Sequence, residues 1–314
     1  MQINNKKMFK QSFIFPKPLE IGDTISIITP SRSITSAEIE PFIDWISNKG
    51  FKIETGANIN RVCGQFGGND EERAKELQQA IDNPSVRAIW CARGGYGSAR
   101  IIEKIDFKPL LKNPKWIVGF SDITAIHSAL YGLGLVSLHA PMPLNFKNDT
   151  ETVNSFETVC SYLTGNYTPL IWNKTVFDKE GKAEGRLFGG NLSVLYSLRG
   201  TPYDINHEKT IFYIEDIDEY LYHIDRICNN LNMSKIFSKI TAFVSGSFTK
   251  MNDNVIPFGM SVQEILLQYL ENVQVRAFDA PFGHINNNFP LINGALATLE
   301  VGKTSVKLSY NGTA

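Results

Sequence analysis

The chain has 314 residues, of which 43% are hydrophobic and 20% charged, and its formal net charge is -1. This length fits two domains, each able to bury its own core. The near-neutral charge gives no sign of the basic face that nucleic-acid binding needs. No apolar run approaches the roughly 20 residues of a membrane-spanning helix. Residues 1–20 contain lysines but no uninterrupted apolar core, so no signal peptide is expected there.

The cysteines are scattered, with no C-x-x-C spacing, at Cys63, Cys91, Cys160 and Cys228. We expect buried free thiols in a reducing cytoplasm. No histidine pair stands at metal-ligand spacing, so neither a metal nor a cofactor is expected.

The first part of the chain alternates short apolar runs with helical stretches. The runs expected to be strands are 24–30, 51–56, 86–92, 116–120 and 136–140. Two of the helices are predicted by capping boxes, one at Thr35 and Glu38 and one at Asn69 and Glu72. Strands that alternate with helices predict a parallel sheet with helices on both of its faces.

A last helix near 150–163 precedes a polar stretch that is rich in turn formers. Beyond that stretch the apolar runs dominate and only 219–234 and 260–272 are expected to be helical. This pattern predicts a smaller α+β domain with a mixed or antiparallel sheet. The expected division is an N-terminal α/β domain over 1–165, a linker over 166–184 and a C-terminal domain over 185–314.

A glycine-rich segment, ARGGYGSAR (92–100), follows an expected strand and opens a helix. Its backbone N–H groups would form a site for negative charge. A dinucleotide loop is disfavoured, because Arg100 stands where close helix packing needs Gly or Ala. A plain tight turn and an oxyanion site are the alternatives that stay open.

The segment VGFSDIT (118–124) places Ser121 where a strand gives way to a helix. Gly119 permits a tight approach, and the N–H of Asp122 would face the same point as the serine hydroxyl. This is the pattern of a nucleophile elbow, although Ile123 replaces the second glycine of G-x-S-x-G. The alternative is that Ser121 or Asp122 caps the helix.

A serine nucleophile needs a base to take its proton. Among the histidines, His284 lies in a loop after a strand, from which a side chain can reach a cleft. His139 ends a strand and could line the same cleft. His127 is expected to point elsewhere, His207 to be solvated, and His223 to be a surface or packing residue.

The imidazole in turn needs a carboxylate to orient it. The segment FYIEDIDEY offers Glu215, Asp216, Asp218 and Glu219. Glu215 is the first polar residue at the carboxyl end of its strand, where side chains enter a cleft. Glu219 is expected to fall in the following helix. A metal site built from these acids is disfavoured, since no histidine pair accompanies them.

Six segments, taken together, resemble the LD-carboxypeptidase family of serine peptidases, which includes the microcin C resistance peptidases. They occur in the family's order and span nearly the whole chain. The segments are GDTISIITPS, GGNDEERAKELQQAIDNPSVRAIWCARGGYGSAR, IVGFSDITAIH, GRLFGGNLSVL, FYIEDIDE and FGHINNNFPLINGA.

The resemblance implies that Ser121 is the nucleophile, Glu215 the orienting acid and His284 the base. It implies an N-terminal domain like the flavodoxin-like and class I glutamine amidotransferase folds, and a C-terminal domain that carries the acid and the base. A homodimer in the cytoplasm is also implied. Backbone N–H groups of Asp122 and of Gly94 or Gly95 are the expected oxyanion donors.

Two substrate classes compete within this family. The murein-recycling branch removes the terminal D-alanine from a murein tetrapeptide, whereas the microcin branch hydrolyses a peptidyl-adenylate mimic and carries an adenine-stacking tryptophan on a longer loop. Only Trp172 falls in the connecting stretch here, and the compact length and GGNLSVLYSLRGTP favour the recycling branch. Arg93 is a candidate for binding the D-alanine carboxylate, or else for a salt bridge to the second domain. A non-catalytic two-domain solute-binding protein is the alternative from another class, disfavoured by the missing export signal.

Overall fold

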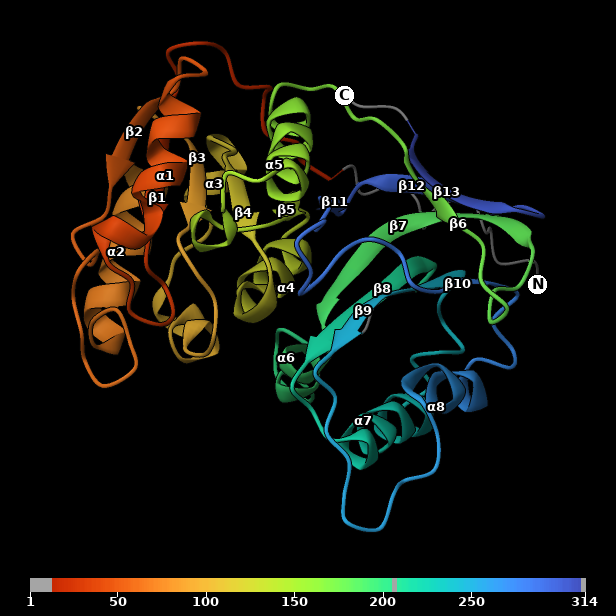
Figure 1. Cartoon of the computed structure of the whole chain (residues 1–314). Coiled ribbons are helices and arrows are strands. Elements are labelled where there is room, and N and C mark those ends of the chain that lie inside the picture. The colour runs from red at the N-terminus through yellow and green to blue at the C-terminus, as the bar shows by residue number, and fades with distance from the viewer. Residues whose placement is uncertain (1–12, 205–207, 312–314) are drawn as a thin grey trace, which may run out of the picture.

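The computed structural model describes residues 13–204 and 208–311. Two β-sheets lie side by side, and each carries its own helices (Figure 1). The first part of the chain forms β1 (Thr24–Ile28), α1 (Ser36–Ser47), β2 (Lys52–Thr55), α2 (Asp70–Asp82), β3 (Val86–Cys91), α3 (Pro109–Lys112), β4 (Trp116–Gly119), α4 (Thr124–Gly132), β5 (Ser137–His139) and α5 (Thr150–Leu163). The rest forms β6 (Leu170–Asn173), β7 (Gly181–Asn191), α6 (Leu192–Ser197), β8 (Thr210–Ile217), α7 (Leu221–Met233), β9 (Ala242–Thr249), α8 (Val262–Tyr269), β10 (Val275–Ala277), β11 (Leu291–Asn293), β12 (Leu296–Val301) and β13 (Ser305–Tyr310).

The first sheet has the strand order β2-β1-β3-β4-β5-β11. Strands β1 to β5 are parallel and follow the order of flavodoxin-like sheets. The last strand, β11, comes from the far end of the chain and pairs antiparallel with β5. The expected parallel sheet is therefore confirmed, with one strand added that the sequence pattern did not predict.

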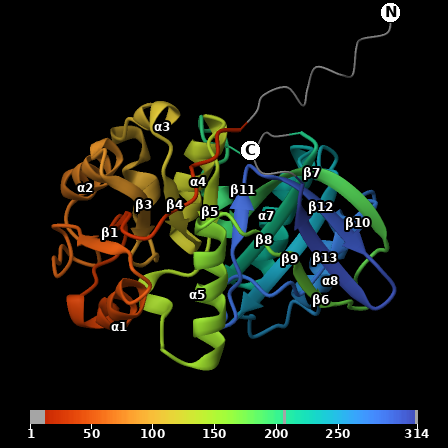
Figure 2. The ribbon, with the colours of Figure 1, turned by 90° about the horizontal axis from the view of Figure 1, so that it is seen from above.

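Helices cover both faces of this sheet, as the alternating pattern predicts. Helices α1 and α5 pack on one face, and α2, α3 and α4 pack on the other (Figure 2). Both predicted capping boxes are present, at Thr35 with Glu38 and at Asn69 with Glu72. Each box satisfies backbone N–H groups that a helix start would otherwise leave unpaired.

The second sheet has the order β10-β9-β8-β7-β12-β13-β6, with α6, α7 and α8 on one face. It is mixed: β7 to β10 are parallel, while β12, β13 and β6 run antiparallel to their neighbours. Strand β6 lies inside the segment expected to be a linker. Its side chains alternate between buried and exposed, so Leu170 and Trp172 pack into the sheet's core.

The cysteine expectation is wrong at one position. Three of the thiols are buried, but Cys63 is exposed because it lies in a polar loop between β2 and α2. Most of the N-terminal stretch and His207 lie outside the described residues. In residues 13–204 and 208–311, no helix is long and apolar enough to span a bilayer.

Candidate active site

The site lies where loops leave the carboxyl ends of β1, β3 and β4. In an open parallel sheet, ligands bind at this edge, beside the point where the strand order reverses. Here the reversal falls between β1 and β3, which are neighbours in the sheet. The second sheet contributes the end of β8 and the loop after β10 to the same place.

Ser121 occupies a strained turn directly after β4. Its φ of 61° is in the left-handed region, which residues other than glycine rarely adopt. Gly119 is required nearby, since a Cβ there would lie 2.9 Å from Cγ1 of Ile123. The short helix η3 (Ser121–Ile123) and α4 both begin without a side-chain cap, so neither Ser121 nor Asp122 has the capping role. The turn has the geometry of a nucleophile elbow.

The structure brings Ser121, His284 and Glu215 together from three distant parts of the chain. The Ser121 Oγ lies 3.1 Å from Nε2 of His284, and Nδ1 of His284 lies 2.6 Å from Oε2 of Glu215. Because the buried carboxylate accepts from Nδ1, Nε2 is left to accept from the serine hydroxyl. Gly283 makes this approach possible: it has a φ of 107°, and a Cβ there would lie 2.9 Å from Cβ of Glu215.

The surroundings of His284 favour its charged form. Burial alone would lower the pKa of His284, but attraction to Glu215 and the hydrogen bond with it, helped by Asp216, raise that pKa above its ordinary value. The ring of Phe120 packs 4.8 Å from the imidazole ring. An imidazole held in this way can take a proton from a hydroxyl and remain stable while charged.

The glycine-rich loop lies against the serine. A Cβ on Gly94 would be 3.4 Å from Ser121 Oγ, so the backbone of Gly94 runs beside the hydroxyl. Gly95 has a φ of 108°, and a Cβ there would overlap the side chain of Arg32. These contacts bring the glycine-rich loop against Ser121, and its predicted role as an oxyanion donor stays a prediction.

The carboxylate of Asp122 ties the elbow to two other loops. It accepts hydrogen bonds from Oγ of Ser31 at 2.5 Å and from the N–H of Ser98 at 2.8 Å. Sequence reasoning missed Ser31 and Ser98. The one available signal was their position. Ser31 is a small polar residue directly after an expected strand, and Ser98 is one inside the glycine-rich segment.

Two further histidines, His127 and His139, lie outside the cleft. His127 is buried, with Nε2 2.8 Å from the carbonyl oxygen of Gly119. His139 was expected to line the cleft, but this is wrong: it is fully buried behind Phe120, with its ring 5.3 Å from that of Tyr213. The rings of Phe120, Tyr213 and Phe282 pack around His139, which is fully buried.

The remaining acids of β8 and its loop have structural partners. Asp216 accepts from Asn191 and Ser193. Glu219 lies before α7 rather than within it, and it bonds Ser193 and His223. This helix was predicted to begin at residue 219 but begins at Leu221, because Tyr220 pairs with Asn252 in an isolated bridge before α7.

In the part of the chain that the structure describes, Arg93 does not form the salt bridge to the second domain that was the alternative to its candidate role as carboxylate ligand. Its guanidinium donates to the carbonyl oxygen of Ser33, at 2.9 Å, within the first domain. Burial lowers the pKa of Arg93, and the nearby charge of Arg32 lowers it further.

An activated serine, a histidine and a buried acid on two α/β units define a serine hydrolase. A family model of the LD-carboxypeptidase N-terminal domain matches residues 25–140, and one of the C-terminal domain matches residues 184–299. The chain belongs to the LD-carboxypeptidase family, and it is a serine-type carboxypeptidase by that membership.

Named relatives agree with this assignment. The chain is 32% identical over 305 residues to a probable murein peptide carboxypeptidase of Bacillus subtilis, covering 93% of each chain. It is 27% identical to the microcin C7 self-immunity protein of Escherichia coli, covering 87% of this chain and 88% of that one. The crystal structure of muramoyltetrapeptide carboxypeptidase from Oxalobacter formigenes is similar with a TM-score of 0.83 and 28% identity, over 92% of this chain and 99% of that one.

Proposed function

We propose that this chain releases the terminal D-alanine from murein tetrapeptide through an acyl-enzyme, and that it does so in the cytoplasm as a homodimer. The observation that carries the proposal is the continuous hydrogen-bonded chain from Ser121 through His284 to the buried Glu215. The murein-directed names of the relatives support the substrate, and the family resemblance supports the dimer and the location.

The mechanism begins with attack of Ser121 Oγ on the carbonyl carbon that precedes D-alanine. His284 takes the hydroxyl proton at Nε2, and Glu215 holds the imidazole and stabilises its positive charge. N–H groups of Asp122 and of Gly94 or Gly95 hold the oxyanion. His284 then gives its proton to the departing amine of D-alanine, and water releases the acyl group.

A peptide substrate is favoured over an adenylate by the state of the tryptophans. Trp172 belongs to the core of the second sheet, and its indole N–H donates to the carbonyl oxygen of Phe278 at 3.0 Å. Trp90 and Trp116 are fully buried in the first sheet. Trp45 packs against Phe146 and the neighbouring aromatic core. None of the four is therefore placed to stack on an adenine in this structure.

The test is product analysis by mass spectrometry on three peptides at equal concentration. Terminal D-alanine should be released from the tetrapeptide, whereas the L-alanine diastereomer and the pentapeptide ending in D-Ala-D-Ala should react about a thousandfold more slowly. Reversed chirality would move the carboxylate away from its binding group. Ser121→Ala should lower the rate at least about 10³-fold. The exposed Ser238→Ala is the matched control.

Comparable rates on all three peptides would contradict the LD specificity and leave the serine hydrolase assignment intact. Normal D-alanine release by Ser121→Ala would contradict the nucleophile. Hydrolysis of a peptidyl-adenylate mimic in preference to the tetrapeptide would favour the microcin-type alternative.

A further inference from the structure

The proposed mechanism fixes the side of the site on which the leaving D-alanine must lie. His284 delivers a proton from Nε2 to the departing nitrogen, so that nitrogen must be within hydrogen-bond reach of the imidazole. A cavity of about 200 Å³ has His284 in its wall. Phe120, whose ring centroid is 4.8 Å from that of the imidazole, lines the same cavity.

The wall of this cavity contains both apolar and charged side chains. Its apolar lining includes Phe120, Pro141, Ile217 and Ile285. Among the described residues that line it, Lys147 is the one lysine or arginine, the remaining titratable group is the base His284, and none has a carboxylate. An apolar wall opposite a single cation matches a small group that has one methyl and one carboxylate.

Lys147 is held in the cavity wall by the loop that carries the base. Its ammonium Nζ donates to Oδ1 of Asn286 at 2.9 Å, and Nδ2 of Asn286 donates to Glu151 at 3.1 Å. An ammonium has three donors, so this bond leaves others for an incoming anion. Since Asn286 lies two positions after His284, the cation and the base are positioned by the same short segment.

We infer that this cavity is the subsite for the leaving residue, with the α-carboxylate of D-alanine on Lys147 and its methyl group against the apolar wall. The inference rests on the proposed function and adds the group that makes the enzyme require a free C-terminus. The volume of about 200 Å³ lies below that of sites for drug-sized molecules, which begin near 300 Å³, and so suits one small amino acid better than an adenylate.

The experiment compares the murein tetrapeptide with the same peptide ending in D-alaninamide, which lacks the negative charge. Wild-type kcat/KM should be higher on the free acid, and Lys147→Met should lower it about 10- to 100-fold on the acid and leave the amide unchanged. This range corresponds to one charge-assisted hydrogen bond. Lys147→Arg should restore most of the preference, because it restores the charge.

Two controls separate binding from folding. Lys303→Met, in the turn between β12 and β13, removes an exposed lysine far from the site and should leave both rates unchanged. Labelling of Ser121 by a fluorophosphonate should be as fast in Lys147→Met as in the wild type, which would show that the catalytic groups are intact.

A Lys147→Met enzyme that is labelled normally and keeps the wild-type preference for the free acid would overturn the inference and leave the proposed function standing. Loss of the preference in Arg32→Gln instead would place the carboxylate on the glycine-loop side and also overturn it. Wild-type enzyme that releases neither D-alanine from the acid nor D-alaninamide from the amide would overturn the proposed function and this subsite with it.

Discussion

Ser121 is held in a backbone conformation that costs on the order of 1–3 kcal/mol for a residue with a side chain. Its neighbours stabilise that conformation. Gly119 leaves room for Ile123, and the carboxylate of Asp122 bonds both Ser31 and Ser98. The strain keeps the hydroxyl exposed at the end of β4 instead of letting the chain continue smoothly into α4.

Glu215 should control the pH at which the enzyme becomes active. His284 must be neutral to accept the serine proton, so kcat/KM rises with pH as the imidazole loses its proton. The negative charge of Glu215 raises the pKa of His284, and Glu215→Gln should therefore move the midpoint of this acid limb to lower pH. The plateau should fall by up to about 10⁴-fold, as when the acid of a triad is made neutral.

A pH-rate profile of the tetrapeptide reaction measures both effects. Glu271→Gln, in an exposed turn after α8, is the control and should leave the midpoint unchanged. A midpoint that stays in place in Glu215→Gln would mean that this carboxylate does not set the charge state of the base.

At this scale the sequence predicted the three residues that meet: Ser121 and Glu215 lie at the carboxyl ends of strands, His284 lies in a loop after one, and the family resemblance implied all three. It did not predict their support. Ser31, Ser98 and Asn286 contact the site through long-range hydrogen bonds that no local pattern encodes. His139 was misplaced because a strand-end position gives no information on which element covers it.

Helix α2 acts as a rigid support beneath the loops that shape the site. Arg73 is fully buried and donates to the carbonyl oxygens of Pro30 and Gly97, and it pairs with Asp70. One turn further on, Glu76 accepts from the backbone N–H groups of Thr29 and Asn58, both at 2.7 Å. One helix face thus binds the loop after β1 through both its donors and its acceptors.

Arg73→Met should destabilise the protein by about 1–3 kcal/mol for each of the two buried carbonyl groups that lose their donor, whereas Asp70 keeps its bonds to Arg100. Arg73→Lys should recover only part of this, since an ammonium cannot reproduce the fork of a guanidinium. Urea unfolding gives the free energy of each variant. The loops should also shift, and kcat for D-alanine release should fall.

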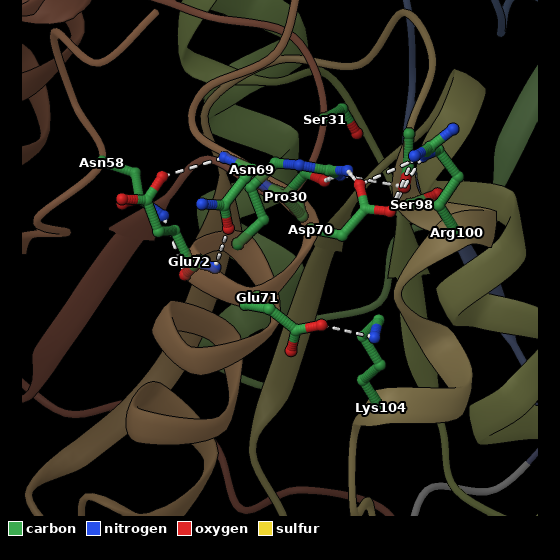
Figure 3. A network of polar contacts seen from close by, with 12 residues as sticks. Pro30, Ser31, Asn58, Asn69, Asp70, Glu71, Glu72, Ser98, Arg100 and Lys104 are labelled. Carbon is green, nitrogen blue, oxygen red and sulfur yellow. Dashed lines mark hydrogen bonds and ion pairs between the residues drawn. The ribbon is translucent and has the colours of Figure 1, made fainter. Parts of the chain in front are cut away.

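Lys104→Met is the control for this network. Its ammonium pairs with Glu71 at the solvent-exposed end of the same group of contacts (Figure 3). An exposed pair contributes at most about 1 kcal/mol. Equal destabilisation by Arg73→Met and Lys104→Met would contradict the role given to the buried guanidinium.

A buried histidine lies at the contact between the two sheets. His139 on β5 packs edge-on against Tyr213 of β8 and Phe282, and within the described residues neither ring nitrogen has a hydrogen-bond partner. Burial lowers the pKa of His139 well below its ordinary value, and the nearby His127 and His284 lower it further. The folded protein therefore keeps this ring neutral where the unfolded chain would protonate it.

Because the unfolded chain binds this proton more readily, stability should fall as pH drops below about 6.5. His139→Phe removes the titrating group and leaves no new unpaired polar atom. Its melting temperature should therefore fall less than that of the wild type between about pH 7.5 and pH 5. Thermal unfolding followed by circular dichroism measures this. An equal loss in both proteins would show that other groups govern the acid response.

The sequence predicted the parallel sheet and its helices well, because alternating apolar runs and capping boxes are local signals. It did not predict that a strand from the C-terminal part of the chain joins the first sheet. Strand β11 is only three residues long, and its apolar side chains give no indication that its partner is β5. Strand β6 was not predicted, because an edge strand carries exposed side chains on one face and its sequence therefore reads as part of a polar stretch.

The late position of β11 has a consequence for how the protein is made. Chains emerge from the ribosome N-terminal part first, and the first domain usually folds before the rest has been synthesised. Here the edge of β5 stays open until residues 291–293 have emerged, close to the end of the 314-residue chain. The nascent first sheet would wait with an unpaired strand, which is a template for wrong pairing. A stop codon anywhere before β11 would thus damage both sheets, although most of the first domain would already have been translated.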